Sequence, residues 1–212
     1  MEKQEAATPN TLERILDSAE ALFAARGFYG VTTREIAKEA GISIQTLHYH
    51  CETKANLYLM VMERAIIPAM KMIDEAVVNM SRLAPSARED FLKAVDNIID
   101  DIFDLFHRNP HYPRLYFRQY MEQNMELMRV ELDRLVPVLR QWARLGEAFV
   151  NQGGKGGVDI LLLLLDLSPM YASLFVNSDF TSLVLGEDKN SMAYLERLKT
   201  HAKDMTHKMM GF

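Results

Sequence analysis

The chain contains little cysteine and no long apolar run. Its single cysteine, Cys51, excludes an intramolecular disulfide and any metal site built from several cysteines. No stretch approaches the roughly 20 apolar residues that a membrane-spanning helix needs. The polar start MEKQEAATPN also lacks the basic and apolar regions of a signal peptide. We therefore expect a cytoplasmic protein with no membrane partner.

Motifs for catalysis or cofactor binding are lacking as well. The sequence has no Ser nucleophile elbow, Rossmann fingerprint, paired-cysteine motif or His-Glu-x-x-His motif. The glycine-rich segment 153–157 lacks the spacing of a phosphate-binding loop, because a glycine follows its lysine. His48 and His50 are two residues apart on an expected helix and point to opposite sides, so they cannot share a metal ion. We predict no enzyme activity, no cofactor and no metal site.

Residues 31–57, VTTREIAKEAGISIQTLHYHCETKANL, predict two short helices around a turn and the start of a third helix. Thr32 and Glu35 have the spacing of a capping box, and Gly41 allows the positive φ of a chain reversal. Ser43 and Thr53 are the expected N-caps of the next two helices. This layout is typical of a helix-turn-helix, although any capped pair of short amphipathic helices gives a similar pattern.

The expected helix after Ser43 has two different faces. One side carries Ile44, Leu47, His48 and Cys51, and the other carries Gln45, Thr46, Tyr49 and His50. The second side suits duplex DNA, because Gln and Thr hydrogen-bond base edges while Tyr and His reach phosphates or thymine methyl groups. Lys54 would add a cation beside the free N–H groups of the next helix, where a phosphate can bind. Cys51 is expected to pack inside, with redox sensing as the alternative.

The run from Thr11 to Leu57 resembles the N-terminal domain of the tetracycline-repressor (TetR) family. The stretches ALFAARGF, VTTREIAKEAGIS and TLHYHCETKANLY carry the resemblance. His48 and Cys51 depart from the aromatic and bulky apolar residues usual in the family. The resemblance implies an all-α fold, with a helix-turn-helix DNA-binding domain at 8–68 and a ligand-binding and dimerisation domain at 69–212.

The resemblance also implies a function and a set of contacts. Family members are homodimeric transcriptional regulators, commonly repressors, that bind a palindromic operator in double-stranded DNA and respond to a small-molecule effector. The implied DNA contacts lie at the start of the second helix, on the recognition helix and just beyond it: Thr33, Arg34, Gln45, Thr46, His48, Tyr49, His50 and Lys54. Two half-sites should lie about one DNA turn apart.

Positive charge is scarce for a DNA-binding chain. The formal net charge is −5, and within residues 26–54 four cations stand against three glutamates, which leaves +1. Helix N-termini, backbone amides and a second copy would have to supplement these cations. We therefore expect a shallow salt dependence and weak non-specific binding.

Helical spacing predicts further helices beyond the first domain, at about 54–80, 84–108, 113–124, 126–150, 159–177 and 192–209. Pro68 falls inside the helix at 54–80 and Pro137 inside the helix at 126–150. Pro85-Ser86 is expected to begin the helix at 84–108. The helix at 159–177 is apolar on all sides but too short to span a membrane. We predict homodimerisation through the last two helices.

Aromatic and methionine side chains concentrate in the middle of the chain and predict a pocket for a small, largely apolar effector. The alternative is ordinary core packing. Arg114 or Arg118 could pair with a ligand carboxylate, and the commoner alternative is a solvated or salt-bridged arginine. The predicted ligand-binding residues are Phe103, Phe106, Tyr116, Phe117, Tyr120, Met121 and Met125.

The sequence thus favours a ligand-responsive repressor. An effector in the C-terminal domain would tilt the helix after Lys54 and change the separation of the recognition helices. The alternative is an interaction module that keeps the TetR fold and has lost sequence-specific DNA binding.

Overall fold

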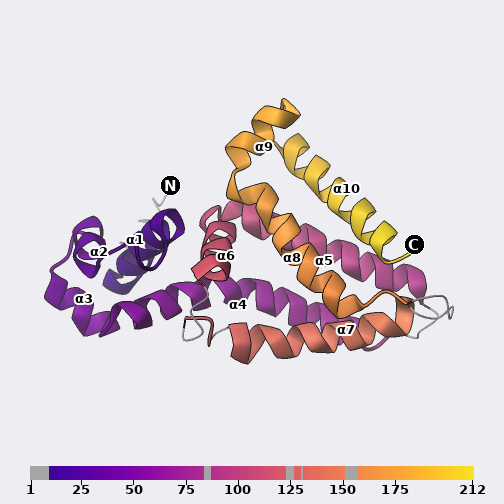
Figure 1. Cartoon of the computed structure of the whole chain (residues 1–212), viewed down its shortest axis with the longest axis horizontal. Coiled ribbons are helices and arrows are strands. Elements are labelled where there is room, and N and C mark those ends of the chain that lie inside the picture. Colours follow the sequence, from indigo (N-terminus) through magenta and orange to yellow (C-terminus); the bar gives the residue numbers. More distant parts are fainter. Residues whose placement is uncertain (1–9, 84–86, 123–126, 130, 151–156) are drawn as a thin grey trace, which may run out of the picture.

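The computed structural model describes residues 10–83, 87–122, 127–129, 131–150 and 157–212. Within these ranges every regular element is a helix, which confirms the predicted all-α fold. The helices form two units joined by α4, Lys54–Met80, which extends from the first unit into the second (Figure 1).

The first unit contains α1, Thr11–Arg26, α2, Thr33–Glu39, α3, Ile44–Cys51, and the first half of α4. Asn10 caps α1 by accepting a hydrogen bond from the backbone N–H of Leu12, as the residue type predicts. The core of this unit comes from the apolar stripes of the four helices: Ile15, Ala19, Phe23, Ile36, Leu47, Leu57, Tyr58 and Val61.

A half-buried arginine holds α4 against α1. Arg64 pairs with Asp17 at 2.8 Å, with Glu20 at 2.5 Å and with Glu13 at 3.4 Å. The three carboxylates are spaced four and three residues apart, so they line one face of α1. Glu20 is buried, and Arg64 is the cation that compensates for the loss of water around its carboxylate.

The buried face of α4 contributes to two different cores. Val61 and Ala65 pack in the first core, whereas Ile73 and Val77 pack in the second. Pro68 lies between these groups, inside the helix. The predicted domain boundary after residue 68 therefore falls within a continuous helix, and the division of the chain there stays a prediction.

The second unit continues with α5, Arg88–Arg108; α6, His111–Glu122; a π-helical turn η1, Glu131–Leu135; α7, Val136–Val150; α8, Ile160–Val176; α9, Ser178–Leu185; and α10, Met192–Met209. Its core packs Phe91, Phe103, Phe149 and Phe175 among aliphatic residues of α4, α5, α7, α8 and α10. Three ion pairs also join α5 to α10: Asp96–His207 at 2.8 Å, Asp100–Lys203 at 2.7 Å and Asp104–Lys199 at 2.8 Å.

Several predicted helix limits need correction. The helix expected at 84–108 begins at Arg88, and the proposed opening at Pro85-Ser86 lies outside the described residues. The helix expected at 113–124 begins two residues earlier, at His111. The stretch expected as one helix at 126–150 is divided into η1 and α7, where Pro137 has no backbone N–H to donate one turn back.

The short helix α9 was not predicted at all. It follows α8 after a sharp bend, so the helices expected at 159–177 and 192–209 are α8 and α10, with α9 between them.

Among the described residues no single helix is long and apolar enough to cross a membrane. The pair α8 and α9, bent by 81° relative to each other, is long and apolar enough when both helices are counted together.

Candidate nucleic-acid interface

The two short helices of the first unit are fixed by local caps. Thr32 and Glu35 form the predicted capping box: the backbone N–H of Thr32 donates to the Glu35 carboxylate at 2.8 Å, and the Glu35 N–H donates to Thr32 Oγ1 at 3.2 Å. The Thr32 hydrogen bonds, together with Arg26 at 2.8 Å, lower the pKa of Glu35 from 4.5 to about 2. Glu35 is therefore ionised at physiological pH.

The turn between α2 and α3 depends on Gly41 and on a distant arginine. Gly41 has φ +65°, which glycine adopts without a steric penalty. The N–H of Ile42 donates to Ala37 O at 3.0 Å, which closes the end of α2. From α1, Arg14 donates to the carbonyl oxygens of Ala40 and Gly41. The angle between α2 and α3 is thus held from outside the motif.

The recognition helix α3 presents one buried and one exposed face. Ser43 caps it by accepting from the Thr46 N–H at 3.0 Å, while Leu47 and Cys51 are buried. Burial raises the pKa of the Cys51 thiol, which makes the reactive thiolate scarcer and agrees with a packing role. On the outer side Tyr49 is 84% exposed, the largest exposed fraction among the large apolar and aromatic side chains of the described residues.

The neighbours of Tyr49 follow the predicted pattern with one exception. Gln45 is exposed, and Thr46 and His50 are half-buried. The placement of His48 on the inner side with Leu47 was wrong. Its side chain is exposed, and Nδ1 lies 3.0 Å from the carbonyl oxygen of Glu52. His48 therefore closes the C-terminal end of α3 while its ring remains accessible.

The remaining predicted DNA contacts lie at the starts of α2 and α4. Arg34 is exposed and Thr33 is half-buried at the start of α2. Lys54 begins α4, and its Nζ lies 4.3 Å from the centroid of the Phe28 ring. Partial burial lowers the pKa of Lys54, against the opposing charges of Glu122 and Glu35. Lys54 is thus a positioned cation at a helix N-terminus, where an anion is favoured.

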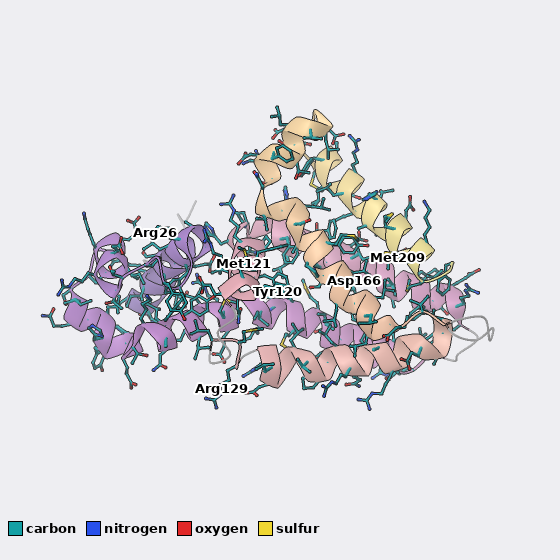
Figure 2. All side chains as sticks on the ribbon, in the orientation of Figure 1. Arg26, Tyr120, Met121, Arg129, Asp166 and Met209 are labelled. Atoms are coloured by element: carbon teal, nitrogen blue, oxygen red, sulfur yellow. The ribbon has the colours of Figure 1, made fainter. Side chains whose placement is uncertain are left out.

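The predicted ligand-binding residues do not gather around one cavity. Phe103 is in the second core, and Phe106 packs edge-on against Phe175. On α6, Tyr116 contacts Phe117 and Tyr120. Tyr120 and Met121 are exposed on α6 near the junction of the two units (Figure 2). Met125 lies outside the described residues.

Two cavities of the described structure are lined by other residues. One, of about 510 Å³, lies beside the first half of α4 and is lined by Asn56, Met60, Glu63, Arg129 and Arg134 among others. The other, of about 300 Å³, follows the contact between α4 and α5. The assignment of the aromatic cluster to an effector site therefore stays a prediction.

Comparison with known proteins identifies the first unit. A family model described as "Bacterial regulatory proteins, tetR family" matches residues 15–61, which contain α2, the turn, α3 and the start of α4. Residues 15–61 therefore resemble the DNA-binding domain of the TetR family. The Bacillus subtilis (strain 168) protein "Probable HTH-type transcriptional regulator YttP" is 27% identical over 110 residues, which are 52% of this chain and 50% of that protein. The chain thus matches about half the length of this relative.

Solved structures share the fold over nearly the whole chain. A TetR family transcriptional regulator, PfmR from Thermus thermophilus, has a TM-score of 0.64 at 15% identity, and the match covers 93% of this chain and 97% of that one. A TetR-like transcriptional regulator from Rhodococcus sp. RHA1 has a TM-score of 0.62 at 18% identity, and the match covers 96% of both chains. At these identities the similarity extends the TetR fold to the second unit and says nothing about its ligand.

The sequence did not predict the hydrogen bonds that join α6 to the end of α1 in the TetR-type domain. Arg118 on α6 donates to the carbonyl oxygens of Ala24 and Ala25 at the end of α1. Glu122, one turn later, accepts from the backbone N–H of Phe28 at 2.8 Å. An arginine and a glutamate four residues apart on a helix normally suggest a pair with each other. Here both reach across to another element, which only the tertiary structure could disclose.

Proposed function

We propose that this TetR-family chain is a ligand-responsive, homodimeric transcriptional regulator that acts as a repressor. It binds a palindromic operator in double-stranded DNA through α3, and a small, largely apolar molecule releases it. The observation that carries the proposal is the outer face of α3. A short helix whose inner face is buried exposes Tyr49 and Gln45, and it is held by caps at both ends.

Each group at this face has a distinct role in the proposal. Gln45 and Thr46 read base edges in the major groove, whereas Tyr49, His48 and His50 contact phosphates or thymine methyl groups. Arg34 and Lys54, at the starts of α2 and α4, contact phosphates of the DNA backbone on either side of the major groove. These contacts fix the position of α3 along the DNA.

The connection between α6 and α1 supports ligand response. An effector that shifts α6 would pull on Arg118 and Glu122, and both contact the segment Ala24–Phe28 directly. The same effector would act on α4, which reaches both cores. A coupling of about 1–3 kcal/mol would change operator affinity roughly 5- to 150-fold, and operator DNA would weaken effector binding by the same factor.

Exposed apolar residues support the homodimer. On α8, Leu162 and Leu165 are more than half exposed although the helix is mostly apolar. A second copy packed against α8 would bury them and would present two α3 helices to one operator.

The proposal is tested by capturing genomic fragments from the source organism with the purified protein at near-physiological salt and sequencing those retained. We expect one palindrome to be enriched by the wild type and lost with Tyr49→Ala. The matched control is Tyr29→Ala, because Tyr29 is also a well-exposed tyrosine but precedes α2. Circular dichroism and gel filtration should show both variants folded like the wild type.

Each result has a clear reading. Loss of the palindrome in Tyr49→Ala alone supports DNA reading by α3, and the genes beside it indicate which molecules to test as effectors. Equal loss in both variants contradicts the assignment to α3. No enriched palindrome with the wild type, after its bound small molecules have been removed, favours the interaction module.

A further inference from the structure

The recognition helix α3 ends in a strained turn. Glu52, which follows its last residue, has φ +55° and ψ −61°. In the part of the chain that the structure describes, it is the one residue other than glycine with a positive φ. The Thr53 N–H donates to Cys51 O at 2.5 Å, so Glu52 is the central residue of a γ-turn of the rare, strained kind. Surrounding contacts must therefore hold Glu52 in this conformation.

Two of these contacts come from His48. The backbone N–H of Glu52 donates to His48 O at 2.8 Å, and His48 Nδ1 lies 3.0 Å from Glu52 O. A carbonyl oxygen only accepts hydrogen bonds, so Nδ1 must carry the hydrogen. In the other neutral tautomer, the lone pair of Nδ1 would face the lone pairs of the carbonyl oxygen. The turn thus selects the Nδ1–H form of the imidazole.

This choice decides what the rest of the ring can bind. A neutral imidazole has a single N–H, so Nε2 of His48 is left as an acceptor. The His48 side chain is exposed, and Gln45 is exposed three residues earlier, which makes the two neighbours on the surface of α3. Beside the amide of Gln45, α3 therefore presents a ring nitrogen that accepts but does not donate.

Duplex DNA offers few donors to such an acceptor. Phosphate oxygens, thymine O4 and the N7 and O6 atoms of guanine are all acceptors, so neutral His48 has no hydrogen to give them. The donors on the base edges of the major groove are the N6 amino group of adenine and the N4 amino group of cytosine. The chemistry of Nε2 thus matches an exocyclic amino group.

We propose that His48 is a specificity-determining residue whose Nε2 accepts a hydrogen bond from the amino group of an adenine or a cytosine in the major groove. Glu52 is its positioning residue, because the carbonyl oxygen fixes both the tautomer and the orientation of the ring. This role rests on the proposed DNA binding by α3, and it narrows the contact of His48 from phosphate or thymine to an amino group. Each base pair has one such group, on one strand, so the contact distinguishes A from T and C from G.

The first test selects binding sites from a random-sequence duplex library at about pH 8, where an ordinary imidazole is neutral. His48→Asn keeps an N–H donor for Glu52 O and removes the Nε2 acceptor. The variant should select the same palindrome, with the preference at one base pair of each half-site reduced by on the order of 10-fold. The matched control is His107→Asn on α5, which should keep every preference. Circular dichroism should show both variants folded.

Base analogues then identify the group that is read. At the affected base pair, replacing adenine by purine, or cytosine by 2-pyrimidinone, deletes the amino group. The wild type should lose on the order of 10-fold in affinity, and His48→Asn should lose less than about twofold, because the contact is already gone. Replacing thymine by uracil, or a purine by its 7-deaza analogue, should affect both proteins equally. A loss confined to the wild type with these last analogues overturns the proposal.

The salt dependence distinguishes a base contact from a phosphate contact. His48→Asn should leave the slope of the logarithm of affinity against the logarithm of salt concentration unchanged. If a cationic His48 of each copy were paired with a phosphate, the substitution would make the slope less steep by about 2, and the proposal would be wrong.

Nitrogen NMR of the free wild-type protein gives a readout that needs neither DNA nor a folded variant. With ¹⁵N-labelled histidine at about pH 8, the His48 ring should show a protonated Nδ1 and a bare Nε2. The long-range coupling from the ring protons to the His48 backbone assigns its signals. A protonated Nε2, in either the neutral or the cationic ring, overturns the proposal.

Failure of this role and failure of the proposed function give different results. If the wild type enriches no palindrome, both are overturned. If it enriches a palindrome in which His48→Asn changes no base preference, reading by His48 is overturned and DNA binding by α3 stands.

Discussion

At the scale of single residues, the local side-chain interactions were predictable and the distant ones were not. The capping box of Thr32 and Glu35 depends on residues three apart, so the sequence contains all of its geometry. The position of Lys54 over Phe28 depends instead on how α1 meets α4. The exposure of His48 likewise depends on how α3 ends, because the imidazole ring turns toward the carbonyl oxygen of Glu52. The spacing of residues along a helix does not predict this orientation.

Glu35→Gln should weaken the fold in a pH-dependent way. The pKa of Glu35 is lowered from 4.5 to about 2 by Thr32 and Arg26, so ionised Glu35 stabilises the folded state. This stabilisation is complete above pH 4.5 and is lost as the pH falls toward 2. The difference in free energy of unfolding between wild type and variant, from urea denaturation, should therefore shrink over that interval.

The control for this prediction is Glu39→Gln on the same helix. Within the described structure Glu39 has no ion pair or side-chain hydrogen bond, so its substitution should give a small difference that changes little with pH. If the difference in free energy of unfolding between wild type and Glu35→Gln stays constant from pH 6 to pH 2, the capping box does not depend on the negative charge of Glu35.

At the scale of helices, the sequence predicted those whose apolar residues repeat at helical spacing over many residues. It did not predict a short helix with few apolar residues. The stripe of Phe91, Val95 and Ile98 located α5 within a few residues. The helix α9 was missed because three apolar residues in eight do not establish a period. The acid stripe of α1 was also missed as a contact, since Glu13, Asp17 and Glu20 resemble a solvated face until Arg64 is placed beside them.

Arg64→Met should loosen α1 from α4. The substitution leaves buried Glu20 without its cation, so we expect a loss of about 1–3 kcal/mol, reduced from the value for a fully buried pair because Arg64 is partly solvated. Thermal and urea unfolding would measure it. Arg134→Met, which removes the looser 3.8 Å pair of Arg134 with Glu63, should cost less than about 1 kcal/mol. Equal losses in the two variants would show that Arg64 acts only as a surface ion pair.

At the scale of the whole molecule, a TetR fold with a net charge of −5 limits how DNA binding can work. Arg26 is occupied by Glu35, and Arg14 holds the turn, so few cations near α3 remain available. The family and the DNA-binding unit were evident from sequence because a capped helix-turn-helix is a local pattern. An effector site could not be assigned from the sequence, since the aromatic residues predicted for it divide between a packed core and an exposed face of α6.

Operator binding should therefore depend on salt less steeply than that of a protein with many more phosphate-paired cations. The exposed Lys38 of α2 is a further cation near α3. If Arg34, Lys38 and Lys54 of two copies neutralise six phosphates, the logarithm of the association constant should fall with the logarithm of salt concentration with a slope of about −5. Arg34→Ala should make the slope less steep by about 2, one contact being lost from each copy. Fluorescence anisotropy over roughly 50 to 300 mM salt measures this, and a slope near −10 would require further cations at the interface.

The matched control is Lys71→Ala, because Lys71 is an exposed cation on α4 well beyond Lys54. Its removal should leave the slope unchanged. A change as large as that of Arg34→Ala would mean that the net charge of the protein, rather than contacts at α3, governs binding.

The three ion pairs between α5 and α10 have a consequence for how the second unit assembles. Acids at 96, 100 and 104 face bases at 207, 203 and 199, so both series repeat every four residues and run in opposite directions. If α10 slid along α5 by one helical turn, two of the three pairs would form again with new partners. The charges therefore select the antiparallel orientation but hardly distinguish one register from the next. That choice is left to features that occur once, such as the Tyr171 hydroxyl donating to Ala202 O and the Arg88 guanidinium 3.9 Å from the Phe212 ring centroid. The ion pairs therefore favour the antiparallel orientation of α10 against α5, and the two single contacts fix its register.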